Sequence, residues 1–72
     1  MKIDYDNPIL LCIDKIFEGV TDQGTDFDIQ AFYTEEDGWQ VERITFSGKV
    51  LNQKELKNQI TETFLENMNK ED

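Results

Sequence analysis

The sequence has 72 residues, with sixteen acidic against seven basic side chains, a net charge of −9, one cysteine and no histidine. A chain of this length forms one domain with a thin core, because folding hides only about 60% of the surface that the unfolded chain exposes. The composition excludes an intramolecular disulfide, lacks the commonest general base and zinc ligand, and disfavours direct binding to nucleic acid or anionic membranes, which depends on lysine and arginine. We therefore predict a single small acidic domain over residues 1–72, ordered over about residues 3–66, with no enzymatic activity and no cofactor.

The first predicted element is a strand over residues 9–20, where β-branched residues are frequent. A helix is the alternative, because Asn7-Pro8 could begin one and Gly19 could end one. On a strand, Cys12 is expected to be a small buried residue rather than a reactive thiol. The longest apolar run is only residues 9–13, and the N-terminus lacks the basic start of a signal peptide, so we expect a cytoplasmic protein that does not enter a membrane.

The second predicted strand covers residues 26–33, in which alternate positions are apolar, as in a strand with one buried face: Phe27, Ile29, Ala31 and Tyr33. Residues 21–25 before it suit a three-residue hairpin loop, with Gly24 in the left-handed conformation. This loop would pair Thr21 with Thr25 and place Glu18 directly opposite Asp28.

A second hairpin is predicted at Asp37-Gly38, a strong signal for a two-residue turn. Such a turn pairs Glu36 with Trp39, Ala31 with Ile44, and Ile29 with Phe46. A three-residue loop is rejected here, because it would point both Lys15 and Arg43 at the core, where two neighbouring cations cost several kcal/mol.

The last predicted element is a helix over about residues 53–67, because apolar residues recur every four positions on one face: Leu56, Ile60, Phe64 and Met68. Asn52 and Glu55 fit a capping box, and Leu51 and Leu56 fit a hydrophobic staple. The predicted fold class is α+β, a three-stranded antiparallel sheet in the order 1-2-3 with one C-terminal helix packed on one face, in the sequence β-β-β-α.

The candidate site is the sheet face away from this helix, where the predicted register gathers acidic and aromatic side chains. Acids rimming exposed aromatics are typical of an interface whose other side is basic, while a merely solvated face is the alternative. The candidate partner-binding residues are Asp14, Glu18, Asp26, Asp28, Phe32 and Trp39.

Other kinds of site find little support in the sequence. The acids around Asp22 and in residues 35–37 could supply oxygen ligands, but their spacing does not match a calcium-binding loop, so no metal site is predicted. Carboxylate pairs such as Glu18 and Asp28 lack the deep cleft that a glycosidase needs.

The uneven charge indicates a function in protein binding. Residues 1–42 hold eleven acids and two bases, whereas residues 43–72 hold five of each. We expect a small inhibitor-like module that neutralises a basic protein partner, either a nucleic-acid-binding enzyme whose phosphate sites it imitates or a toxin. The alternative is a homo-oligomeric structural or accessory subunit, a homodimer for example, joined along the edge of the third strand at Val41, Arg43 and Thr45.

Overall fold

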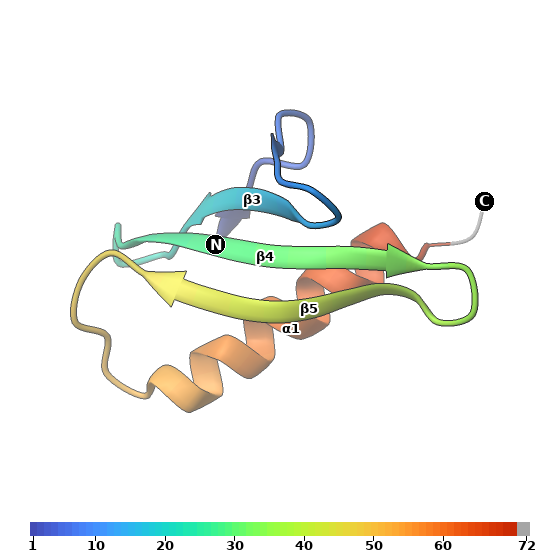
Figure 1. Cartoon of the computed structure of the whole chain (residues 1–72). Helices are drawn as coiled ribbons and strands as arrows, with labels where there is room; N and C mark the ends of the chain where they lie inside the picture. Colours follow the sequence, from blue (N-terminus) through green and yellow to red (C-terminus); the bar gives the residue numbers. More distant parts are fainter. Residues whose placement is uncertain (71–72) are drawn as a thin grey trace.

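A computed structural model describes residues 1–70 and contains one antiparallel sheet and one helix (Figure 1). The elements in chain order are β1 (Lys2–Ile3), β2 (Ile9–Leu10), β3 (Lys15–Val20), β4 (Asp26–Thr34), β5 (Gly38–Phe46) and α1 (Gln53–Met68). The strands lie in the order β1-β3-β4-β5, and β2 also pairs with β3. The predicted α+β class, with an antiparallel sheet and a C-terminal helix, is confirmed, but the sheet has five strands instead of three. No helix within residues 1–70 is long and apolar enough to cross a bilayer.

The two additional strands cover the outer edge of β3. Lys2 pairs with Val20 in one short ladder and Ile9 with Ile16 in the other, and between them the Asp4 amide donates to the Glu18 carbonyl at 2.8 Å. An edge strand left open would expose a row of unpaired backbone groups. The N-terminal ten residues therefore complete the sheet on this side.

The strand predicted over residues 9–20 is interrupted, because β2 covers Ile9–Leu10 and β3 covers Lys15–Val20, so the prediction is wrong over residues 11–14. Residues 11–14 turn the chain from β2 back into β3, closed by a hydrogen bond of 2.9 Å from the Leu11 amide to the Asp14 carbonyl. The alternative of a helix over residues 9–18 is also wrong, since β3 begins at Lys15. Cys12 lies in this turn and is exposed, which corrects its expected burial on a strand.

The hairpin between β3 and β4 is confirmed. The Thr21 amide donates to the Thr25 carbonyl at 2.9 Å, and the Thr25 amide donates to the Thr21 hydroxyl at 3.0 Å. Gly24 has φ 85°, the left-handed conformation that glycine adopts without a steric cost. The loop fixes the register, so Glu18 lies directly opposite Asp28 as predicted.

The predicted register of β4 and β5 is wrong. Thr34 pairs with Gly38, so the connection is a loop of residues 35–37, and Ala31 pairs with Val41. The register then shifts between Ala31 and Gln30, and Gln30 pairs with Arg43, which leaves Glu42 as the extra residue of a β-bulge.

This bulge removes the objection to the three-residue loop. It brings Ile44 opposite Ile29 and Phe46 opposite Phe27 on the helix side, while Arg43 shares the other side with Gln30. Of the two cations, only Lys15 lies on the helix side, with its ammonium 5.4 Å from the centroid of the Trp39 ring. A cation over an aromatic face is attracted to it, so this lysine needs no carboxylate partner.

The core lies between the sheet and α1, as the position of the helix behind the strands in Figure 1 indicates. The predicted helical stripe is confirmed, because Ile60 and Phe64 are fully buried and Leu56 and Met68 pack against the core. Phe17 meets Phe64 edge to face, with ring centroids 5.0 Å apart. The buried residues are Phe17, Phe27, Ile29, Ala31, Ile44, Ile60 and Phe64.

The start of α1 agrees with the prediction, but its cap does not. Asn52 has a left-handed backbone, with φ 57° and ψ 44°, and its side chain makes no capping hydrogen bond. Leu51 is 90% exposed, so it does not form the predicted staple with Leu56. The helix is therefore held by the burial of its apolar face instead of by its first turn.

Gly19 lies in a tightly packed part of the sheet. A Cβ atom at this position would lie 2.4 Å from the Phe27 ring and 2.8 Å from the Lys2 carbonyl oxygen. The ring is buried and cannot move aside, so only glycine fits here without distortion.

Candidate interaction surface

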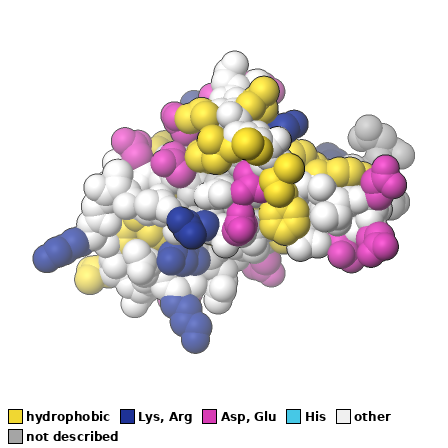
Figure 2. Space-filling view, viewed as in Figure 1, with side chains coloured by type: hydrophobic (Ala, Val, Ile, Leu, Met, Phe, Trp, Pro, Cys, Tyr) yellow, Lys and Arg dark blue, Asp and Glu magenta, His cyan; other side chains and the backbone are white. Residues whose placement is uncertain are grey.

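The candidate surface is the face of β3, β4 and β5 that α1 leaves uncovered, called here the outer face. Directly opposed residues on neighbouring strands share a face, and this relation defines three cross-strand rows. The rows are Ile16, Gln30 and Arg43; Glu18, Asp28 and Thr45; and Val20 with Asp26. Figure 2 views the molecule with the helix behind the sheet and shows acidic side chains spread over this surface.

Five of the six candidate residues belong to this face. Glu18, Asp26 and Asp28 are exposed in the rows. Phe32, half-buried, continues the alternation of β4 beyond Gln30, and Asp14 is held beside Gln30 by a hydrogen bond. The structure thus brings these five residues together, while their role in binding a partner stays a prediction.

Trp39 does not belong to this face, which corrects its predicted position. Its ring meets Phe17 and Phe64 edge to face, with centroids 5.8 and 6.3 Å away, so it packs on the helix side. Val41 lies on the same side, packed against the core. The displacement of Trp39 follows from the three-residue loop, which reverses the faces of the β5 residues before the bulge.

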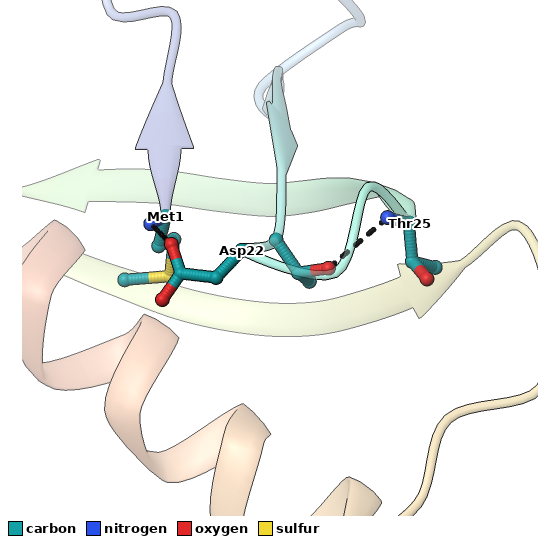
Figure 3. A network of polar contacts seen from close by, with 4 residues as sticks. Met1, Asp22 and Thr25 are labelled. Carbon is teal, nitrogen blue, oxygen red and sulfur yellow. Dashed lines mark hydrogen bonds and ion pairs between the residues drawn. The ribbon is translucent and has the colours of Figure 1, made fainter.

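The centre of the outer face carries two opposed carboxylates. Glu18 and Asp28 are directly paired, which places their Cβ atoms about 4.5–5.5 Å apart. Within the described part of the chain, the one ion pair joins the Met1 amine to Asp22, at the β3–β4 loop (Figure 3). Within residues 1–70, no basic group therefore forms a salt bridge with Glu18 or Asp28 to offset their repulsion.

A second acidic cluster lies at one end of the outer face. The Gln30 amide donates to Asp14 at 2.6 Å and to Glu42 at 3.2 Å, so one side chain holds two carboxylates together. Hydrogen bonding and then charge repulsion from Asp14 raise the pKa of Glu42, against a smaller opposing effect of Arg43. Sequence analysis missed Glu42 because its position depends on the bulge.

The acidic surface continues past the edge of β3. An open hollow of about 500 Å³ lies between this strand and the N-terminal segment, with Lys2 as its cation. Its acidic lining residues are Asp4, Asp6, Glu18 and Asp26. The alternation of Lys2 and Asp4 with the half-buried Ile3 and Tyr5 is the signal in the sequence that could have identified this edge strand.

Residues 9–13, called here the apolar segment, are more exposed than the predicted strand implies. A continuous strand over residues 9–20 would place Leu11 and Ile13 on the same face as the buried Phe17, yet they are 46% and 86% exposed. The predicted strand would have buried them, whereas the turn at residues 11–14 carries them past the end of the core.

The seam suggested for a homo-oligomer is the edge of β5, the last strand of the sheet. Arg43 and Thr45 are exposed there, but the Asn69 side chain occupies the edge at Trp39, accepting from its amide at 2.8 Å and donating to its carbonyl at 3.3 Å. One end of this edge is therefore already paired from within the chain, and oligomer formation stays a prediction.

Within residues 1–70, no group of three or more cysteine or acidic side chains is arranged to hold a metal ion. No protein-family model, no curated protein and no solved structure matches the chain. The chemistry of the outer face therefore carries the functional argument.

Proposed function

We propose that this chain binds a basic protein through the outer face of its sheet and thereby blocks the partner's positively charged surface. The observation that carries the proposal is the pairing of Glu18 with Asp28 at the centre of that face. Like charges placed directly opposite each other destabilise an isolated sheet by a few tenths of a kcal/mol. A partner that inserts lysine or arginine between them removes this repulsion on binding.

The balance of charge on the outer face supports the same conclusion. Its described carboxylates are Asp14, Glu18, Asp26, Asp28 and Glu42, and its cations are Arg43 and, at the β1 edge, Lys2. A surface with this excess steers a basic protein toward it and repels acidic ones, which raises the association rate and the specificity.

The partner class that fits best is a protein whose own ligand is polyanionic, such as a nucleic-acid-binding enzyme, or a basic toxin. Carboxylates at alternate positions of a strand, as in Asp26 and Asp28, repeat at about 6.6 Å. Such a row offers a series of negative charges to side chains that otherwise contact phosphates. Inhibition then results from occupancy, because the partner's groove is filled.

The test starts with capture from a lysate of the source organism on immobilised wild-type chain, followed by salt elution and mass spectrometry. The same capture is run with Glu18→Lys/Asp28→Lys and with a matched control, Glu62→Lys/Glu66→Lys, which makes the same charge change on exposed helix positions. We expect basic proteins that the wild type and the control retain and the outer-face variant loses.

The purified partner is then titrated with the chain. For a nucleic-acid-binding partner, the wild type should displace fluorescently labelled DNA or RNA, as followed by anisotropy, and Glu18→Lys/Asp28→Lys should not. Equal retention by both variants would show that another surface binds. A chain that forms a salt-resistant dimer and retains no basic protein would support the homo-oligomeric alternative instead.

A further inference from the structure

The apolar segment presents more exposed apolar surface than its surroundings. Its large side chains, Ile9, Leu10, Leu11 and Ile13, are 47%, 70%, 46% and 86% exposed, and Cys12 between them is exposed too. Figure 2 shows hydrophobic side chains gathered at the top of the molecule, where Figure 1 draws the N-terminal segment above the sheet, directly beside acidic ones. Single exposed apolar residues are ordinary, but a contiguous patch of them marks an interaction site.

The backbone holds this patch in one conformation. Ile9 pairs with Ile16 and Leu10 with Lys15, so β2 fixes the segment to the sheet edge. The hydrogen bond of 2.9 Å from the Leu11 amide to the Asp14 carbonyl closes the turn. A group presented on a fixed turn loses less conformational entropy on binding than one on a flexible loop.

Carboxylates border the patch on the outer face. Asp14 follows the segment directly, and the Gln30 amide holds it next to Glu42. The neighbouring cation, Lys15, lies over the Trp39 ring on the helix side. The patch is therefore bordered by carboxylates on the outer face and by Lys15, opposite Leu10, on the helix side.

The carboxylates beside the patch distinguish three molecules that could bind it: a second copy of the chain, a membrane and a basic protein. In a dimer formed through it, two copies with a charge of −9 each would bring their Asp14 and Glu42 clusters together. An anionic membrane would repel the same cluster. A protein that offers an apolar pocket, with lysine or arginine on the side that meets the outer face, matches both the patch and its carboxylate border.

We infer that residues 9–13 are the apolar anchor of the interface, and that they insert into an apolar pocket with a basic rim on the partner. This inference rests on the proposed function, because it names a second contact of the same basic protein. The outer face attracts the partner by charge, and Leu10 and Ile13 supply the buried contact that holds it.

The test uses two 18-residue helical peptides as probes. One has a leucine stripe on a lysine background, and the other has glutamine at every leucine position. Binding to the isotope-labelled chain is followed by NMR of the isoleucine and leucine methyl groups. We expect the leucine peptide to bind at least tenfold more tightly and to shift the methyl signals of residues 9–13.

The matched variants are Leu10→Ser/Ile13→Ser, at the two most exposed large apolar side chains of the segment, and Glu18→Lys/Asp28→Lys. The serine variant should bind both peptides equally while keeping the wild-type unfolding midpoint, because it removes only exposed side chains. The lysine variant should weaken both peptides by a similar factor.

Each other outcome overturns a distinct claim. If the wild type binds both peptides equally, the apolar anchor is wrong while the acidic docking surface stands. If the leucine peptide binds the serine variant as well as the wild type, the anchor is also wrong. If the lysine variant binds the peptides as tightly as the wild type, the proposed function fails while the anchor stands. If the wild type binds neither peptide, both the proposed function and the anchor are wrong. A dimer of the free chain in sedimentation equilibrium that Leu10→Ser/Ile13→Ser dissociates would show that a second copy covers the patch.

Discussion

The same three strands, β3, β4 and β5, build both faces of the sheet, but one face is buried and apolar and the other is exposed and acidic. The helix side buries Phe17, Phe27, Ile29 and Ala31 almost completely, whereas the outer side exposes Glu18, Asp26 and Asp28 on the same strands. Burying a large apolar side chain contributes about 1.5–3 kcal/mol, while surface charges contribute a few tenths. Stability is therefore concentrated on one face, and the other face can carry charge that does not help the fold.

The largest expected effect comes from making the same substitution in the core between α1 and the sheet and on the outer face. Phe64→Ala leaves a cavity against Phe17 and should cost about 3–5 kcal/mol, enough to unfold much of a domain with a thin core. Phe32→Ala on the outer face should cost less than about 1.5 kcal/mol, because that ring is half-exposed. Urea unfolding followed by circular dichroism measures both. Similar losses for the two would contradict the contrast between the faces.

A glycine pair gives the next largest effect. Gly19→Ala should cost about 1–3 kcal/mol, because its Cβ would meet the buried Phe27 ring at 2.4 Å. Gly48→Ala is the control, since nothing lies within 4 Å of its added Cβ, and should change stability by less than about 0.5 kcal/mol. The difference in urea midpoint between the two variants tests whether the helix side is tightly packed around Gly19. A tolerated alanine at position 19 would show that the Phe27 ring can move.

On the outer face a substitution should stabilise the fold. Asp28→Asn removes the repulsion with Glu18 and should raise the free energy of unfolding by about 0.2–1 kcal/mol, with less gain at high salt. Asp22→Asn is the control, because Asp22 accepts from the Met1 amine, and it should lower stability slightly or not at all. Thermal unfolding at low and high salt measures both. A loss of stability in Asp28→Asn would contradict the claim that this pair is a cost to the isolated chain.

The smallest expected effect is a pH dependence at Glu42. Because Asp14 raises the pKa of Glu42 above the ordinary 4.5, the folded state binds more protons than the unfolded state between 4.5 and the raised value. Stability contributed by this group therefore rises as the pH falls through that window. Glu42→Gln should be more stable than the wild type at neutral pH and lose that advantage below pH 4.5. A difference that does not depend on pH would show that the two carboxylates do not interact.

The contrast between the faces also explains what the sequence could predict. The β3–β4 hairpin was predictable because Gly24 fixes its loop, and a one-residue change of register would have moved Phe27 and Ile29 to the solvent. The helix was predictable because its apolar face alone holds it, which is also why its start was right although the expected cap was wrong.

The β4–β5 pairing was not predictable from alternation, because a bulge interrupts alternation. Glu42 adds one residue, so Val41 and Ile44 both face the core although they differ by three positions. Trp39 was misplaced for the same reason. The strand β2 has only two residues, too few for a periodic signal, and β1 is marked only by the short alternation of residues 2–5, so the exposure of residues 9–13 emerged only from the structure.

The measurement that tests the central claim most directly is calorimetric titration of the captured basic partner with three forms of the chain. The wild type and Glu62→Lys/Glu66→Lys should bind with affinities within about threefold of each other, and Glu18→Lys/Asp28→Lys should bind about 100-fold more weakly, a difference of about 2.8 kcal/mol. Equal affinities for the two charge-reversed variants would mean that net charge alone, and not the outer face of the sheet, determines binding.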